Sequence, residues 1–181
     1  LALSPDGSIV AWGWDLDGSV TDAPSGSGYT EIAASFAYGL ALAADGSIAA
    51  WGWDTYGQIS QAPTDTGFTA IAANESHCLA LAADGSIVSW GRDLDGTLVS
   101  DTPTEGGFTA IAAASLHSMA LAADGSIVAW GRDFGGGISD RPTAPRLTAI
   151  VGADIDDHDG LSRPGAAFIF NDGEGGDGLW S

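Results

Sequence analysis

Two histidines and four aspartates recur at equivalent places in this 181-residue chain, and they are the first candidates for chemistry. His77 and His117 each precede a short apolar stretch. Histidines on neighbouring repeats can hold a metal ion, but their repetition at the start of a strand favours a hydrogen bond within each repeat. The aspartates follow the pattern Trp-Gly-x, at Asp15, Asp54, Asp93 and Asp133.

A pair of carboxylates that performs acid–base catalysis needs two different environments. Four equivalent aspartates do not offer that difference, so we expect each to bond the backbone two residues further on, as turn aspartates do. The sequence contains no nucleophile elbow, zinc-ligand cluster or phosphate-binding loop. We therefore predict no catalytic residues and a protein that is not an enzyme.

A group of aspartates near the end of the sequence is a candidate calcium site, formed by Asp154, Asp156 and Asp159. Calcium takes several carboxylate and carbonyl oxygens from a flexible loop with a glycine-assisted turn, and Gly160 follows the group. Asp157 and Asp159 depart by one residue from an alternating order, so a solvated acidic turn is the alternative. No other cofactor is predicted.

The residue between each Trp-Gly pair and its aspartate alternates between two types, as Trp14, Trp53, Arg92 and Arg132. A position that must pack in a core would stay apolar, so this position is predicted to lie on a surface loop. Tryptophan and arginine are both favoured as anchors of protein interfaces. We predict that these four residues form a partner-binding rim. The alternative is that each lies over the adjacent repeat, the arginines through their apolar stems.

An internal repeat must position these residues. The sequence LALAADGSIVSWG recurs with small changes at residues 1–13, 40–52, 79–91 and 119–131. Its tryptophans are spaced by 39, 39 and 40 residues. The extra residue lies between Trp90 and Pro103, which predicts a surface loop there.

Each copy is predicted to form a β-hairpin around an Asp-Gly pair, because glycine and, to a lesser extent, aspartate tolerate the positive φ of a tight turn. Before the turn, Leu79 and Leu81 point to one face of the strand, and Ala80 and Ala82 point to the other. Both faces are apolar, so we expect other sheets to cover them both.

Further strands are predicted between the hairpins. A third strand fits residues 29–34, 68–73 and 108–113, and a short fourth strand fits residues 57–60 and 96–99. Three to four strands per repeat of this length are typical of a β-propeller blade. The predicted fold is an all-β propeller with four-stranded antiparallel blades, of which this chain supplies four to five as part of a longer repeat protein.

The sequence HCLAL at residues 77–81, followed by Asp84-Gly85 and Trp90-Gly91, resembles the regulator of chromosome condensation repeat. The resemblance covers residues 1–150 and is closest to short secreted bacterial and archaeal members, including a propeller that inhibits β-lactamases. It implies a protein-binding propeller. Tyr38 replaces the histidine of the family, and the basic arm of the eukaryotic founder is missing. The nucleotide exchange and chromatin docking of that founder are therefore not carried over.

Residues 148–153, the acidic turn and residues 165–170 resemble an FG-GAP repeat, the blade of integrin α-type propellers. The second predicted domain is therefore a partial FG-GAP-like blade over residues 151–181, after repeats over residues 1–150. Its predicted strands are 148–153 and 166–170, and the resemblance implies that the loop between them can bind calcium.

The composition limits the partners. The chain carries 24 acidic residues against five arginines and no lysine, for a net charge of −19. Such a surface repels nucleic acid and anionic lipid. It indicates a high-salt habitat, where self-repulsion is screened, or else an ordinary acidic secreted protein. No segment has the roughly 20 consecutive apolar residues that span a membrane. The single cysteine, Cys78, has Ser118 as its equivalent and is predicted to be a buried structural residue.

We therefore predict a non-enzymatic, protein-binding β-propeller that is extracellular or at the cell surface, a fragment of a larger repeat protein. The alternatives are a structural spacer in a surface protein and a propeller scaffold attached to a catalytic domain outside this chain.

Overall fold

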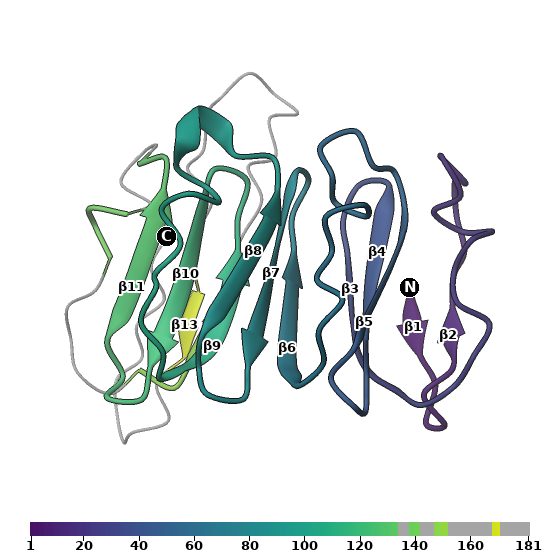
Figure 1. Ribbon diagram of the computed structural model, residues 1–181, viewed down its shortest axis with the longest axis horizontal. Helices are drawn as coiled ribbons and strands as arrows, with labels where there is room; N and C mark the ends of the chain where they lie inside the picture. Colours follow the sequence, from purple (N-terminus) through teal and green to yellow (C-terminus); the bar gives the residue numbers. More distant parts are fainter. Residues whose placement is uncertain (134–137, 142–146, 152–167, 171–181) are drawn as a thin grey trace.

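The computed structural model describes residues 1–133, 138–141, 147–151 and 168–170. Its strands form five separate antiparallel sheets, in the orders β1-β2, β3-β4-β5, β6-β7-β8, β11-β10-β9 and β12-β13. The sheets lie side by side, each built from consecutive strands (Figure 1). Their strands are β1 (Ala2–Leu3), β2 (Ile9–Val10), β3 (Tyr29–Ala34), β4 (Tyr38–Ala43), β5 (Ile48–Gly52), β6 (Phe68–Ala73), β7 (His77–Ala82), β8 (Ile87–Gly91), β9 (Phe108–Ala113), β10 (His117–Ala122), β11 (Ile127–Gly131), β12 (Ala149–Val151) and β13 (Phe168–Phe170). The arrangement confirms the predicted β-propeller fold.

The large side chains of one sheet pack against the small side chains of the next. Leu40 and Leu42 of β4 share a core cluster with Ala80 of β7, and Leu79 of β7 shares a second cluster with Ala120 of β10. The two faces of β7 are both covered, since Leu79 and Ala80 have no exposed surface. Burial of one leucine side chain stabilises the fold by roughly 1.5–3 kcal/mol. The prediction that both faces are covered is therefore confirmed.

The Asp-Gly turns differ from the prediction in the role of the aspartate. Gly46 has a φ of 80°, but none of the aspartates in the Asp-Gly pairs of the four hairpins has a positive φ. Asp45 instead accepts hydrogen bonds from the amide and the hydroxyl of Ser47, at 2.9 and 2.7 Å. The turn is a three-residue loop that ends in a glycine bulge. The amide of Gly46 donates to the carbonyl of Ala43 across this loop.

These turns also join neighbouring sheets. The amides of Gly67 and Phe68, at the start of the next sheet, donate to the carbonyls of Asp45 and Gly46 at 3.1 and 3.2 Å. A Cβ atom on Gly46 would lie 2.4 Å from the amide nitrogen of Gly67. Glycine is therefore required at this position both for its φ and for the close approach of the two backbones.

The predicted fourth strand is wrong. Each sheet of the three central repeats has three strands, and residues 57–60 form turns. The cause is Asp54, which accepts hydrogen bonds from the amides of Ile59 and Ser60 at 2.8 and 3.1 Å, so these amides cannot pair with a strand. The bonds also correct the predicted partner, since they reach residues five and six positions further on. Burial works to raise the pKa of Asp54, but these bonds outweigh it and lower the pKa below its usual value.

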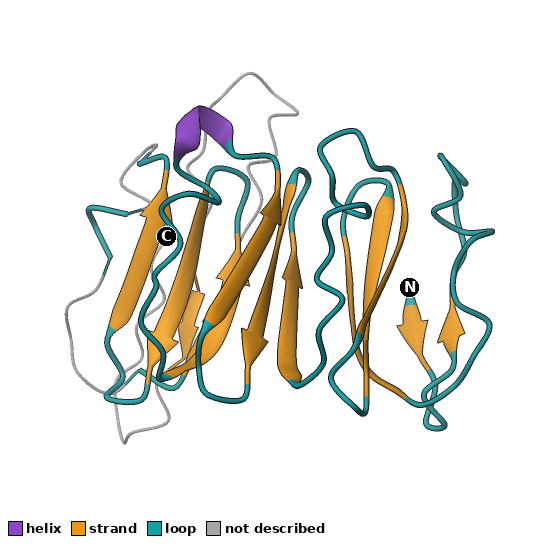
Figure 2. Cartoon of the chain, viewed as in Figure 1, coloured by secondary structure: helices purple, strands orange, loops and turns teal. Residues whose placement is uncertain are grey.

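The extra residue of the third repeat lies in the predicted loop, where residues Leu94–Gly96 form a short 3-10 turn, η1. Asp93 consequently bonds the amides of Val99 and Ser100, one residue later than in the other copies. Figure 2 shows η1 as the helical element among strands and loops. No helix in the described part of the chain is long and apolar enough to cross a bilayer.

The repeat tryptophans link each sheet to the one before it. The indole nitrogens of Trp51, Trp90 and Trp130 donate to backbone carbonyls 32 residues earlier, at 3.1, 2.8 and 3.2 Å. Those carbonyls belong to the loop that leaves the preceding sheet. Trp12, which follows β2 in the first repeat, is 63% exposed.

The last sheet agrees with the two strands predicted after residue 147. β12 pairs with β13, and Ile150 is in register with Ile169. The FG-GAP resemblance and the division of the chain at residue 150 stay predictions.

Candidate functional site

The strand pairing gathers two sets of loops at one end of the sheets. Tyr38 pairs with Gly52, so the loop before β4 and the segment after β5 lie at the same end. The amide of Trp53 donates to the carbonyl of Ala37 at 2.9 Å, and equivalent bonds recur in the next two repeats. We call this end the loop face, formed by residues 35–37, 53–62, 74–76, 92–102 and 114–116. The Asp-Gly turns lie at the opposite end, the turn face.

The loop face carries an aromatic and cationic cluster that joins two sheets. Trp53 and Tyr56 meet edge to face, with ring centroids 5.5 Å apart and planes at 75°. Arg92, from the next repeat, places its guanidinium carbon 4.8 Å from the centroid of the Tyr56 ring. An exposed cation–π contact of this kind contributes about 0.5–1 kcal/mol. The structure thus brings two predicted rim residues together through Tyr56, which the sequence analysis did not single out.

The other two rim residues lie apart from this cluster. Trp14 is 76% exposed in the first repeat. Arg132 forms an ion pair with Asp95 at 3.8 Å, in which both side chains are more than half exposed. Such a surface pair contributes at most about 1 kcal/mol. Arg92 and Arg132 each contact the loop of the preceding repeat through the guanidinium group, whereas the alternative interpretation invoked their apolar stems. Whether the four residues bind a partner stays a prediction.

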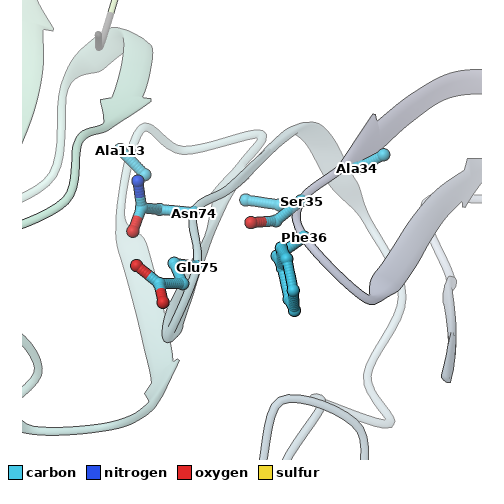
Figure 3. A pocket seen from close by; sticks show the side chains of 7 residues that line it. Ala34, Ser35, Phe36, Asn74, Glu75 and Ala113 are labelled. Atoms are coloured by element: carbon cyan, nitrogen blue, oxygen red, sulfur yellow. The ribbon is translucent and has the colours of Figure 1, made fainter. Parts of the chain in front are cut away.

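A cavity of about 480 Å³ opens on the same face, between the loops of three successive repeats (Figure 3). Asn74 is 6% exposed, and its Oδ1 atom is one of three buried polar side-chain atoms in the described residues that have no hydrogen-bonding partner. Figure 3 shows the amide of Asn74 and the carboxylate of Glu75 projecting to the same side of their loop. The cavity is lined by Ala34, Ser35, Phe36, Ala73, Asn74, Glu75 and Ala113.

The preceding repeat braces this loop. Gln58 is fully buried, and its side chain accepts from the amide of Tyr56 at 2.9 Å and donates to the carbonyl of Glu75 at 3.4 Å. The hydroxyl of Tyr38 donates to the carbonyl of Asn74. The cavity loop and the aromatic cluster therefore share Gln58 as a common support.

The sequence analysis missed the cavity residues. The only signal for them is that the repeats differ there: Ser35, Asn74 and Ala114 are equivalent, and so are Phe36, Glu75 and Ser115. Positions that a repeat needs for its own fold stay the same, as the lining alanines at 34, 73 and 113 do.

The buried polar residues below the loop face connect sheets. The Nε2 atom of His77 lies 2.8 Å from the hydroxyl oxygen of Ser118, in the next sheet. The thiol of Cys78 donates to the hydroxyl of Tyr38, in the preceding sheet, at 3.2 Å. The predicted hydrogen bond within the repeat is therefore wrong for His77, because its side chain reaches a different sheet.

Burial favours the neutral forms of His77 and Cys78. Desolvation, together with His117, lowers the pKa of His77 to about 4. Desolvation raises the pKa of the Cys78 thiol to about 12, which confirms that Cys78 is a buried structural residue. Within the described ranges, no group of three or more histidine, cysteine or acidic side chains could hold a metal ion. The predicted calcium ligands Asp154, Asp156 and Asp159 lie outside those ranges.

The stacked three-stranded sheets and their inter-sheet tryptophan bonds define a β-propeller scaffold. Residues 68–97 match the family model of the regulator of chromosome condensation (RCC1) repeat. This segment is therefore similar to an RCC1 repeat, in agreement with the resemblance found in the sequence. No curated protein sequence matches the chain.

Several solved structures share the fold. The ectodomain of the receptor kinase CR4 from Physcomitrella patens superposes with a TM-score of 0.63 at 22% identity, over 84% of this chain and 43% of that one. The CRINKLY WD40 ectodomain of the Arabidopsis thaliana receptor kinase ACR4 gives 0.57 at 22% identity, over 68% and 44%. Prp20p from Saccharomyces cerevisiae, described with its binding properties to Gsp1p and histones, gives 0.53 at 22%, over 70% and 42%. The chain spans less than half of each structure, and likeness at this identity concerns the fold alone.

Proposed function

We propose that this chain is part of a non-enzymatic β-propeller that binds a protein partner through its loop face, outside the cell or at its surface. One observation carries the proposal: Trp53, Tyr56 and Arg92 form a continuous cluster across two repeats at this face. Tryptophan, tyrosine and arginine are the residue types that dominate binding energy in protein interfaces. The Prp20p structure supports the proposal in general terms, because a propeller of this fold was described with protein partners.

The net charge of the chain limits the kinds of molecule that we expect as partners. A net charge of −19 opposes nucleic acid and anionic membranes, whose binding requires cationic contacts. The same charge attracts a basic protein surface and accelerates its association at low ionic strength.

The test is capture of partners by the immobilised protein from the medium and the surface fraction of cells that carry the gene. The variants Trp53→Ala and Arg92→Ala should each reduce capture at least about tenfold if they anchor the interface. The controls are Asp65→Ala and Glu105→Ala, which change exposed residues at the turn face and should leave capture unchanged. Equal capture by all four variants, with the fold verified by circular dichroism, would overturn the proposal.

A further inference from the structure

The first sheet has an apolar face that no other sheet covers in the described part of the chain. We call it the open face, formed by Ala2, Val10 and Trp12. Trp12 is 63% exposed, whereas the equivalent tryptophans of the next three repeats are only 3–5% exposed. Ala2 is also exposed, although its equivalent Ala80 has no exposed surface. Figure 1 shows β1 and β2 at the end of the row of sheets, where this face has no neighbour.

The later repeats show what such a face packs against. Ala80 and Trp90 lie in one core cluster with the leucines of β4, which belong to the preceding sheet. The next pair of sheets repeats this packing. Each buried tryptophan also donates to a backbone carbonyl of the preceding repeat, whereas Trp12 has no hydrogen bond to the described residues. The open face therefore fits a sheet that presents large apolar residues at the leucine positions of the repeat.

The β12-β13 sheet carries large apolar residues at those positions. In β6 and β7, the isoleucine of the Thr-Ala-Ile sequence is in register with an alanine that two leucines flank. In β12 and β13, the residue at the same register is Ile169, which Phe168 and Phe170 flank. The two phenylalanines therefore take the leucine positions of the repeat. In β7 these positions belong to the face that packs on the following sheet.

We propose that two copies of this chain dock head to tail, with the β12-β13 sheet of one copy against the open face of the other. Docking repeats the packing that already joins the sheets within the chain, and Trp12 donates to a backbone carbonyl of the second copy. The two surfaces differ, so the contact is heterologous, and a pair of chains joined by two such contacts forms a closed ring. One chain matches less than half of each solved structure, so two chains supply about the length of one ring.

The net charge of the chain determines when this contact forms. Each copy carries a net charge of −19, so two copies repel each other at low ionic strength although the docking surfaces are apolar. Salt shortens the range of this repulsion from roughly 10 Å at 0.1 M to roughly 3 Å at 1 M. We therefore expect the association constant to rise at least about tenfold between these salt concentrations. The open face lies on the broad side of a sheet and not on the loop face, so the inference does not rest on the proposed function.

The experiment is sedimentation equilibrium of the 181-residue chain in 0.1 M and 1 M sodium chloride. We expect the mass of two chains in 1 M salt and dissociation toward the mass of one chain in 0.1 M salt. Trp12→Ala should weaken the association at least about tenfold, because it removes the largest side chain of the open face. Phe36→Ala, which removes a similarly exposed aromatic ring elsewhere, should have no effect. The mass of one chain at both salt concentrations, or equal weakening by the two variants, would overturn the inference.

A mixing experiment tests that the two surfaces are different. Ala2→Glu places a charge on the open face, and Phe168→Glu places one on the β12-β13 sheet, so each variant alone should associate at least about tenfold more weakly. Ser27→Glu adds the same charge at an exposed residue outside the open face and should associate like the original protein in 1 M salt. An equal mixture of the first two variants should form a 1:1 pair, because each variant keeps the surface that the other has lost. With the fold verified by circular dichroism, no recovery in the mixture would contradict head-to-tail docking.

Discussion

The imidazole of His77 and the hydroxyl of Ser118 meet across the boundary between two sheets, with Nε2 and Oγ 2.8 Å apart. Both residues have no exposed surface. Neighbouring sheets of this fold are therefore joined inside the core by polar contacts as well as by leucine and alanine packing. Stability experiments can detect such a contact, because removal of one side chain leaves the other buried without its hydrogen-bonding partner.

Replacement of Ser118 tests this contact. Ser118→Ala removes the partner of a buried imidazole and should lower the free energy of unfolding by about 1–3 kcal/mol. Ser118→Cys introduces the residue of the preceding repeat and should cost less, because the thiol can still hydrogen bond. Urea denaturation measures both, with Ser27→Ala at an exposed position as the control. If the Ala and Cys variants are as stable as the original protein, the contact does not stabilise the fold.

The lowered pKa of His77 predicts acid sensitivity. Its ordinary value is 6.5 and its folded value is about 4, because burial disfavours the charged ring. Below pH 6.5 the imidazole of His77 is protonated in the unfolded chain, whereas in the folded chain it stays neutral down to about pH 4. His77 therefore costs the protein no stability above pH 6.5. Between pH 6.5 and about pH 4 it lowers the free energy of unfolding by about 3 kcal/mol in total.

His77→Tyr is the matched variant for the acid sensitivity, since Tyr38 occupies the equivalent position one repeat earlier. Urea denaturation between pH 7 and pH 4.5 should show a shallower loss of stability in this variant than in the original protein. A residual slope is expected from His117, whose pKa burial also lowers. Identical slopes in the two proteins would contradict the assignment to His77.

The close contact at the hairpin turn predicts a difference between two glycines. Gly46 and Gly67 have φ values of 80° and 89°, so alanine is strained at both. Only at Gly46 would the new Cβ atom meet the backbone, 2.4 Å from the amide nitrogen of Gly67, whereas at Gly67 no atom lies within 4 Å. Gly67→Ala should cost about 1 kcal/mol and Gly46→Ala clearly more. Thermal unfolding followed by circular dichroism compares them, and equal costs would show that the sheets do not touch there.

The tryptophans offer a second matched pair. Trp90 is 3% exposed and donates to the carbonyl of Gln58 at 2.8 Å, whereas Trp12 is 63% exposed. Trp90→Phe should lower the free energy of unfolding by about 1–3 kcal/mol, because the buried carbonyl loses its donor. Trp12→Phe should change it by less than about 0.5 kcal/mol. Chemical denaturation measures both. A larger effect at Trp12 would contradict the claim that Trp90 links its sheet to the preceding one.

Much of the fold follows from the sequence because it depends on neighbouring residues. The strands of each hairpin form where large and small apolar residues alternate, as in LALA at residues 79–82, and the glycine of each Asp-Gly pair sets the turn. The fourth strand was predicted wrongly because the pattern alone does not show that Asp54 captures the amides of Ile59 and Ser60.

The candidate site could be predicted only in part. The change from tryptophan to arginine along the repeats pointed to Trp53 and Arg92 as surface residues. Nothing in their spacing showed that Tyr56 would lie between them, since that depends on how far the loop of one repeat extends over the next. The same holds for Asn74 and Glu75, whose loop faces Phe36 across a sheet boundary.

The sequence by itself therefore determined the repeat, the hairpins, the apolar faces and the acidic surface, because short-range patterns and composition specify these features. The tertiary structure decided which residues some 40 positions apart meet, as His77 does with Ser118 and Arg92 with Tyr56. The physical reason is that contacts between stacked sheets depend on the offset and twist of one sheet against the next. Those quantities are set by the packing of whole sheets, which the order of residues within one repeat does not contain.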